Sequence, residues 1–105
     1  MAKFQKLDAR KLLGDVPDEF VFRCHDGSIF RNMSELRDGL EAISDETYYI
    51  HANADRNDFS NWVSDIIRDE KLARDLVKAP SRLQAAKSVA ARISSLSAKL
   101  EPMTA

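Results

Sequence analysis

The fold of this chain is decided by the stretch DFSNWVSDIIR, residues 58–68. Its five large apolar residues fall at spacings of three and four, which puts them on one face of an α-helix. Burying five such side chains contributes roughly 8 to 15 kcal/mol before conformational entropy is subtracted. The stretch therefore predicts a buried helix at the centre of the core, with Asn57 or Asp58 as its N-cap. The expected core residues are Phe59, Trp62, Val63, Ile66 and Ile67.

Helical patterns lie on both sides of this stretch. Residues 33–43 repeat apolar side chains at helical spacing after Asn32, a good N-cap. Ser44 can cap a further short helix, since acidic residues follow it in the first turn. On the other side, Asp69 opens a short helix that Pro80 ends. The residues expected to face inward there are Leu72, Ala73, Leu76 and Val77.

The longest predicted helix closes the sequence. Ser81 and Gln84 form a capping box, and neither Gly nor Pro interrupts the chain until Pro102, so we expect a basic amphipathic helix over 81–101. Its predicted apolar stripe consists of Leu83, Ala86, Ala90, Ile93, Ser97 and Leu100, widened by Val89 and Leu96. Such a helix docks either onto its own bundle or onto another chain.

The N-terminal part predicts less regular structure. A short helix is expected between Asp8 and Gly14. The turn sequence of residues 25–28 contains Asp-Gly between aromatic and β-branched residues, which predicts a two-stranded ribbon. An isolated hairpin is marginally stable in water, so this ribbon must place some of its aromatic residues on the helical core. The residues available for that are Phe20, Phe22 and Phe30.

Length and composition limit the architecture. With 105 residues and 11.9 kDa, the chain has room for one core, and we expect a single domain over 1–105 whose central part is 20–77. The predicted class is a mainly α small helical bundle with a short β-ribbon near the N-terminus and a long C-terminal helix. No apolar run is long enough to span a membrane, residues 1–10 lack the apolar centre of a signal peptide, and Cys24 has no disulfide partner in the chain. The expected location is the cytoplasm.

The charge is balanced overall but unevenly distributed. The chain has 16 basic and 17 acidic residues, which excludes a global basic field that would gather nucleic acid. Residues 29–77 hold six basic and eleven acidic side chains, whereas residues 78–105 hold five basic and one acidic. An acidic body is thus joined to a basic terminal helix. Such a chain can satisfy these charges internally, pair with a copy of itself or bind an acidic partner.

Few residues are suited to catalysis or metal binding. His51 can share a helical face with Asp55 and Asp58, which would suit a general base or a metal ligand, but the chain offers too few further ligands for a metal site. Residues 24–26, Cys-His-Asp, are neighbours on a strand and cannot form a triad, because adjacent side chains point to opposite faces. We therefore expect a structural role for His51, a buried Cys24, and neither a metal nor a cofactor.

The C-terminal helix carries the residues expected to contact a partner, namely Arg82, Lys87, Arg92 and Lys99. Their spacings scatter them around the helix instead of aligning them, which weakens a model in which the helix reads a nucleic-acid groove. A protein partner or self-association is the first expectation, and nucleic acid the second. No membrane partner is expected.

A resemblance covers residues 20–77. The segment has Phe-x-x-x-Asp-Gly at 22–27, His51, Asn-Asp-Phe-x-x-Trp at 57–62 and Leu-Ala at 72–73. This pattern resembles a family of small uncharacterised archaeal and bacterial domains, which brings no established activity. The resemblance implies one structural unit in which His51 meets the helix start at Asn57 and Asp58. The residues of that unit are His51, Asn57, Asp58, Phe59 and Trp62.

Three functions remain from the sequence. The first is a non-catalytic protein interaction or assembly module that uses the basic C-terminal helix, because the charges are polarised and no catalytic set is evident. The second is a nucleic-acid accessory protein that uses the same helix. The third is a small ligand-binding or enzymatic domain centred on His51 and Asp58, which requires a pocket at those side chains.

Overall fold

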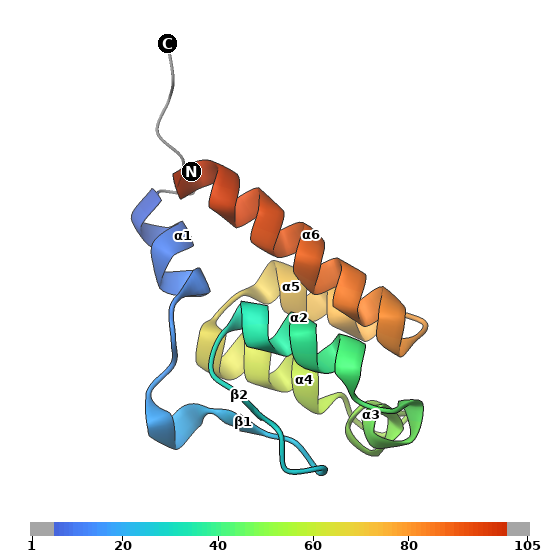
Figure 1. The fold of residues 1–105 in the computed structure, drawn as a ribbon. Helices are drawn as coiled ribbons and strands as arrows, with labels where there is room; N and C mark the ends of the chain where they lie inside the picture. Colours follow the sequence, from blue (N-terminus) through green and yellow to red (C-terminus); the bar gives the residue numbers. More distant parts are fainter. Residues whose placement is uncertain (1–5, 101–105) are drawn as a thin grey trace.

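The computed structural model describes residues 6–100 and has the predicted class, a mainly α-helical bundle with a short ribbon and a long C-terminal helix (Figure 1). The elements in chain order are α1 (Lys6–Leu13), η1 (Asp18–Phe20), β1 (Phe22–Arg23), β2 (Ile29–Phe30), α2 (Met33–Ala42), α3 (Asp45–His51), α4 (Asp58–Trp62), η2 (Val63–Ile67), α5 (Glu70–Lys78) and α6 (Arg82–Leu100). The predicted helix over 81–101 is α6, and residue 101 lies outside the described range.

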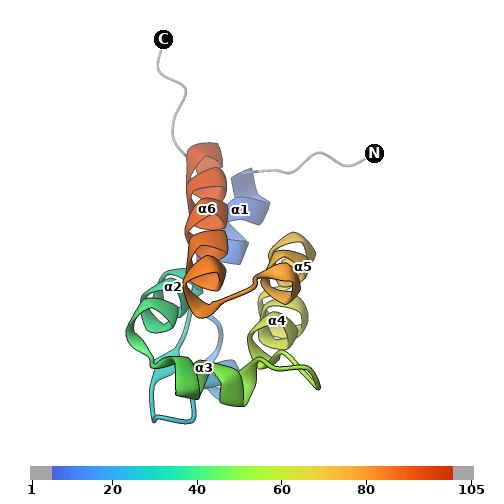
Figure 2. The ribbon, with the colours of Figure 1, turned by 90° about the vertical axis from the view of Figure 1, so that its right-hand side faces the viewer.

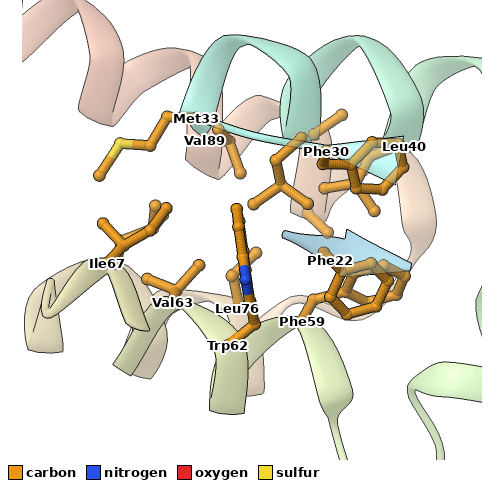
Figure 3. Packing of buried hydrophobic residues seen from close by; sticks show 14 of the residues in the cluster. Phe22, Phe30, Met33, Leu40, Phe59, Trp62, Val63, Ile67, Leu76 and Val89 are labelled. Carbon is orange, nitrogen blue, oxygen red and sulfur yellow. The ribbon is translucent and has the colours of Figure 1, made fainter. Parts of the chain in front are cut away.

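Helix α6 runs along α1, α2 and α5 and joins them into one body. In Figure 2, α2 lies on one side of α6, α4 and α5 lie on the other, and α3 lies between them at one end. The buried side chains of these elements form one hydrophobic cluster, to which the ribbon contributes Phe22 and Phe30. The interior is therefore shared by segments far apart in the sequence (Figure 3).

The stretch over 58–68 forms the expected helix with one change near its end. Asn57 is the N-cap and accepts a hydrogen bond from the backbone N–H of Ser60. After Trp62 the helix widens into the π-helical turn η2, in which the N–H of Arg68 donates to the carbonyl of Val63 at 2.7 Å. Four of the five predicted residues are buried, namely Phe59, Trp62, Val63 and Ile67. Ile66 was predicted to be buried but is only partly buried, because the extra residue of the π-turn rotates it off the apolar face.

The ribbon has the predicted antiparallel pairing, with Phe22 opposite Phe30. Gly27 has a φ of 94°, a left-handed conformation that glycine adopts without strain, so the turn depends on this residue. The ring of Phe22 stacks on Phe30 with centroids 5.6 Å apart and on Phe59 at 4.9 Å. The two-stranded ribbon is thus held by aromatic packing onto α4 (Figure 3). Phe20, the third residue considered for this role, is largely exposed.

The predicted helix starts are confirmed by side-chain caps. Each cap accepts a hydrogen bond from a backbone N–H three residues later, which satisfies one of the free donors of a helix N-terminus. These caps are Asn32 before α2, Ser44 before α3, Asp69 before α5 and Ser81 before α6. At the N-terminus, α1 ends at Leu13 immediately before Gly14, as expected.

Two predicted core positions were wrong. Val77 and Leu83 are exposed, although the patterns placed them on buried faces. Val77 lies in the last turn of α5 and Leu83 in the first turn of α6, on the two sides of the turn that joins these helices. The buried residues of α6 are Ala85, Ala86, Val89 and Leu96, and all of these except Ala85 belong to the predicted stripe. The small alanines at its start permit a close approach to α2 and α5.

Candidate functional site

His51 lies at the end of α3 and connects three segments. Its Nε2 accepts a hydrogen bond from the backbone N–H of His25 at 2.9 Å, and its Nδ1 lies 3.0 Å from Oδ2 of Asp58. Because Nε2 accepts, a neutral ring carries its proton on Nδ1 and donates it to the Asp58 carboxylate. Both ring nitrogens are therefore engaged, one with the ribbon turn and one with the start of α4.

The surroundings of His51 are apolar on one side and charged on the other. Its ring packs edge-on against Phe22 and Phe59, with centroid distances of 5.2 and 5.4 Å. Asp58 also lies 3.4 Å from Nε of the exposed Arg56. A general base needs a ring nitrogen that a substrate can reach, and this geometry leaves none. The arrangement holds the ribbon, α3 and α4 together.

The residues implied by the family resemblance do lie together. The expected contact of His51 with the helix start is present, through Asp58. Asn57 caps α4 and also donates from Nδ2 to the carbonyl of Leu76 at 3.3 Å, which connects α4 to the end of α5. Trp62 donates from its indole nitrogen to the carbonyl of Phe20 at 2.7 Å. Each of these side chains satisfies a backbone group in another segment.

Arg82 is the first residue of α6 and is engaged within the chain. Its Nε lies 2.9 Å from Oδ1 of Asp45, the first residue of α3. One terminal nitrogen donates to the carbonyls of Leu40 and Glu41, which belong to the last turn of α2. A guanidinium placed there satisfies free carbonyls and complements the negative end of the helix dipole. The side chain thus fixes α6 to the junction between α2 and α3.

Arg92 forms the most buried ion pair of the described residues. Its Nε lies 2.7 Å from Oδ2 of Asp69, and the two side chains are 12% and 2% exposed. The other carboxylate oxygen of Asp69 accepts the N–H of Leu72 and so caps α5. Two of the four arginines and lysines expected to bind a partner therefore hold α6 on its own bundle. The other two, Lys87 and Lys99, are exposed.

Cys24 and His25 do not form a reactive pair. Cys24 is buried, as expected, and this burial raises the pKa of its thiol above the ordinary value, which disfavours the nucleophilic thiolate. Within residues 6–100, no three His, Cys, Asp or Glu side chains gather closely enough to hold a metal ion. Over the same range, no helix has both the length and the apolar character needed to cross a membrane.

Three exposed apolar side chains lie on neighbouring elements, and the sequence patterns assigned two of them, Val77 and Leu83, to the interior. Tyr49, Val77 and Leu83 are 51%, 64% and 53% exposed, and we call them the α3–α5–α6 patch. They lie on α3, the end of α5 and the start of α6, which are toward the same side of the molecule in Figure 1. The Arg82–Asp45 ion pair fixes α6 against α3 at this end. A sequence signal that points to Val77 and Leu83 is Pro80, because it ends one helix before the next begins and lies three residues from each of them.

Comparisons with protein-family models, with curated proteins and with solved structures found no match to this chain. The resemblance over residues 20–77 therefore stays a prediction.

Proposed function

We propose that the chain is a non-catalytic protein interaction or assembly module that binds its partner through the α3–α5–α6 patch at the start of its basic C-terminal helix. The observation that carries this proposal is the exposure of Val77 and Leu83 on the two sides of one helix-helix turn. Single exposed aliphatic residues are ordinary on a protein surface, but a group at one end of a fold is typical of an interaction site.

The charges beside the patch favour an acidic partner. Lys78 and Lys87 are exposed and form no ion pair with any described side chain. An apolar contact bordered by uncompensated lysines fits a protein surface in which carboxylates surround apolar side chains. Charges at such a rim guide association and orientation more than they determine affinity.

The geometry of the other candidates supports them less well. An enzyme centred on His51 and Asp58 would need a free ring nitrogen, and both nitrogens are engaged. Nucleic-acid binding by α6 would use Arg82 and Arg92, whose guanidinium groups already bind Asp45 and Asp69. Few cations of α6 then remain to neutralise phosphates, which is the main source of affinity in such complexes.

Binding by matched variants tests this proposal. The full chain, tagged, is used to capture proteins from its native cell, alongside a variant with Val77→Ser and Leu83→Ser and a control with Ile29→Ser, an exposed aliphatic residue of the ribbon. Captured proteins are purified and titrated against each variant, and sedimentation velocity of the chain alone measures self-association. We expect the patch variant to lose partner binding or self-association, with folding unchanged, while the control retains it.

Two results would overturn the proposal. One is equal binding by the patch variant and the Ile29→Ser control. The other is a monomeric chain that retains only nucleic acid, in a salt-dependent manner, because this would favour the second candidate function.

A further inference from the structure

A second surface feature lies between α1 and the end of η2, where Figure 1 places α1 and the turn from η2 to α5 on the same side of the molecule. A groove of about 740 Å³ is present there. Its volume is within the range of roughly 300–1,000 Å³ that is typical of small-molecule sites. The groove is formed by α1, the segment after it, and η2, and it involves none of the residues of the α3–α5–α6 patch.

The floor of the groove is aliphatic. Leu12 and Val16 line it from the N-terminal side, and Ile66 and Ile67 line it from η2. Ile66 lies in the π-turn, is only partly buried against the core and so contributes part of the lining. None of the described residues that line the groove is aromatic, which favours an aliphatic ligand over a planar ring.

The rim of the groove is basic. Arg10, Lys11 and Arg68 line it, and none of these three forms an ion pair with a described side chain. Two carboxylates also line it, Asp8 and Asp15, and Asp15 accepts a hydrogen bond from the side chain of Asn32 at 2.7 Å. Among the described residues, three cations and two carboxylates thus line the groove, which leaves an excess of positive charge there.

Arg68 has an unusual backbone for its residue type. Its φ of 74° is left-handed, the conformation in which helices usually place glycine after their last turn. π-helical turns and left-handed residues other than glycine are both uncommon, and both are concentrated at functional sites. Here they occur at consecutive positions, and together they direct a long cationic residue to the edge of an apolar groove.

We propose that this groove binds a small amphipathic anion, with an aliphatic chain against Leu12, Val16 and Ile66 and a carboxylate or phosphate headgroup at Arg68. A guanidinium binds either headgroup through paired hydrogen bonds, whereas an uncharged chain of equal length would gain only the apolar contact. The site is separate from the surface proposed for protein partners, so each can be tested without the other.

Titration of the full chain with decanoate, decyl phosphate and decanol tests the proposal. We expect saturable one-to-one binding of at least one of the two anions, with amide shifts concentrated at residues 10–17 and 66–69 in heteronuclear NMR spectra. The relative affinities of decanoate and decyl phosphate identify the preferred headgroup. Decanol is expected to bind at least about threefold more weakly, since it lacks the charge.

Two variants isolate the headgroup contact. Arg68→Asn removes the cation but tolerates a left-handed backbone, and Lys87→Gln removes an exposed cation of α6 that does not line the groove. We expect Arg68→Asn to weaken binding of the anion about three- to tenfold and Lys87→Gln to leave it unchanged. The absence of saturable binding, equal affinity for decanol, equal losses in the two variants, or shifts outside the groove would each overturn the assignment.

Discussion

Replacing Arg92 with methionine should severely destabilise the fold. Methionine keeps much of the apolar length of the side chain but removes the charge that lies 2.7 Å from Asp69. The Asp69 side chain is only 2% exposed. Of the donors observed at its carboxylate, only the N–H of Leu72 would remain. Breaking a buried pair by removing one partner costs about 3–5 kcal/mol, because an uncompensated charge stays buried.

This cost is large for a chain of this size. Domains of about 100 residues have a free energy of unfolding of about 5–15 kcal/mol, and each kcal/mol shifts Tm by about 4–8 °C. We therefore expect Arg92→Met to lower Tm by at least about 12 °C. Urea unfolding followed by circular dichroism and by Trp62 fluorescence measures the change. Arg74→Met is the matched control, since Arg74 is exposed and has no ion pair with a described side chain, and it should change stability by less than about 0.5 kcal/mol.

A double substitution separates the ion pair from simple packing. Asp69→Asn keeps an oxygen that can cap α5 but removes the negative charge. Combined with Arg92→Met, it removes the uncompensated charge, so the double variant should be more stable than Arg92→Met alone, with a coupling energy of about 1–3 kcal/mol. If Arg92→Met costs no more than Arg74→Met, or if the two changes are additive, the reasoning that α6 is held by this ion pair is refuted.

Three further substitutions test other contacts. Gly39→Ala should destabilise the fold by about 1–2 kcal/mol in thermal unfolding, because the added carbon would lie 2.2 Å from ring atoms of Phe30 and this overpacking exceeds the gain in helix propensity; a neutral or stabilising effect would contradict it. His51→Phe should cost about 1–3 kcal/mol in urea unfolding at neutral pH, because it leaves the N–H of His25 without its acceptor and removes one partner of Asp58, and a change below about 0.5 kcal/mol would contradict a structural role for His51. Burial raises the pKa of the Tyr48 phenol above its ordinary value of 10.0, as it does that of the Cys24 thiol above 9.0, so the fold favours the neutral forms. The contribution of these neutral groups to stability is complete below about pH 9 and is lost as the pH rises through their raised pKa values. The free energy of unfolding should therefore fall less between pH 8 and pH 10.5 in Tyr48→Phe than in the wild type. An equal fall in both proteins would contradict a role for the Tyr48 phenol in this loss of stability.

The helix starts could be predicted from the sequence because their determinants are local. A cap and the N–H that it binds are three residues apart, so Asn32, Ser44, Asp69 and Ser81 could be recognised without any tertiary contact. The ribbon turn was equally local, since Asp-Gly supplies the left-handed residue that the turn requires. The core face of α4 followed from periodicity alone, apart from Ile66.

Features that depend on where one helix ends against another could not be predicted in this way. Periodicity defines the face of a helix but not how far that face is covered, so Val77 and Leu83 were assigned to the interior although both are exposed. The π-turn left no recognisable pattern in the sequence, and the groove beside it brings together residues about 50 positions apart, such as Leu12 and Ile66. The groove and the exposed patch depend on tertiary contacts, so motifs and residue spacing in the sequence could not predict them.

Part of the uneven charge distribution along the chain is used for ion pairs within the fold. The basic helix α6 supplies Arg82 and Arg92 to Asp45 and Asp69 in the acidic body, so two of its positive charges direct the docking of α6 onto the bundle. Charge polarity in a sequence therefore does not by itself indicate a partner, because a terminal helix that folds back needs the same pattern. What favours a partner is the charge that folding leaves uncompensated. Among the described residues, such cations lie beside the apolar patch at the α5–α6 turn and at the rim of the groove below α1, and both places also have accessible aliphatic side chains. Arg82 and Arg92 are paired within the chain, whereas these two surfaces combine cations without an ion pair and accessible apolar side chains. For this reason we propose that binding partners contact these two surfaces rather than the length of α6.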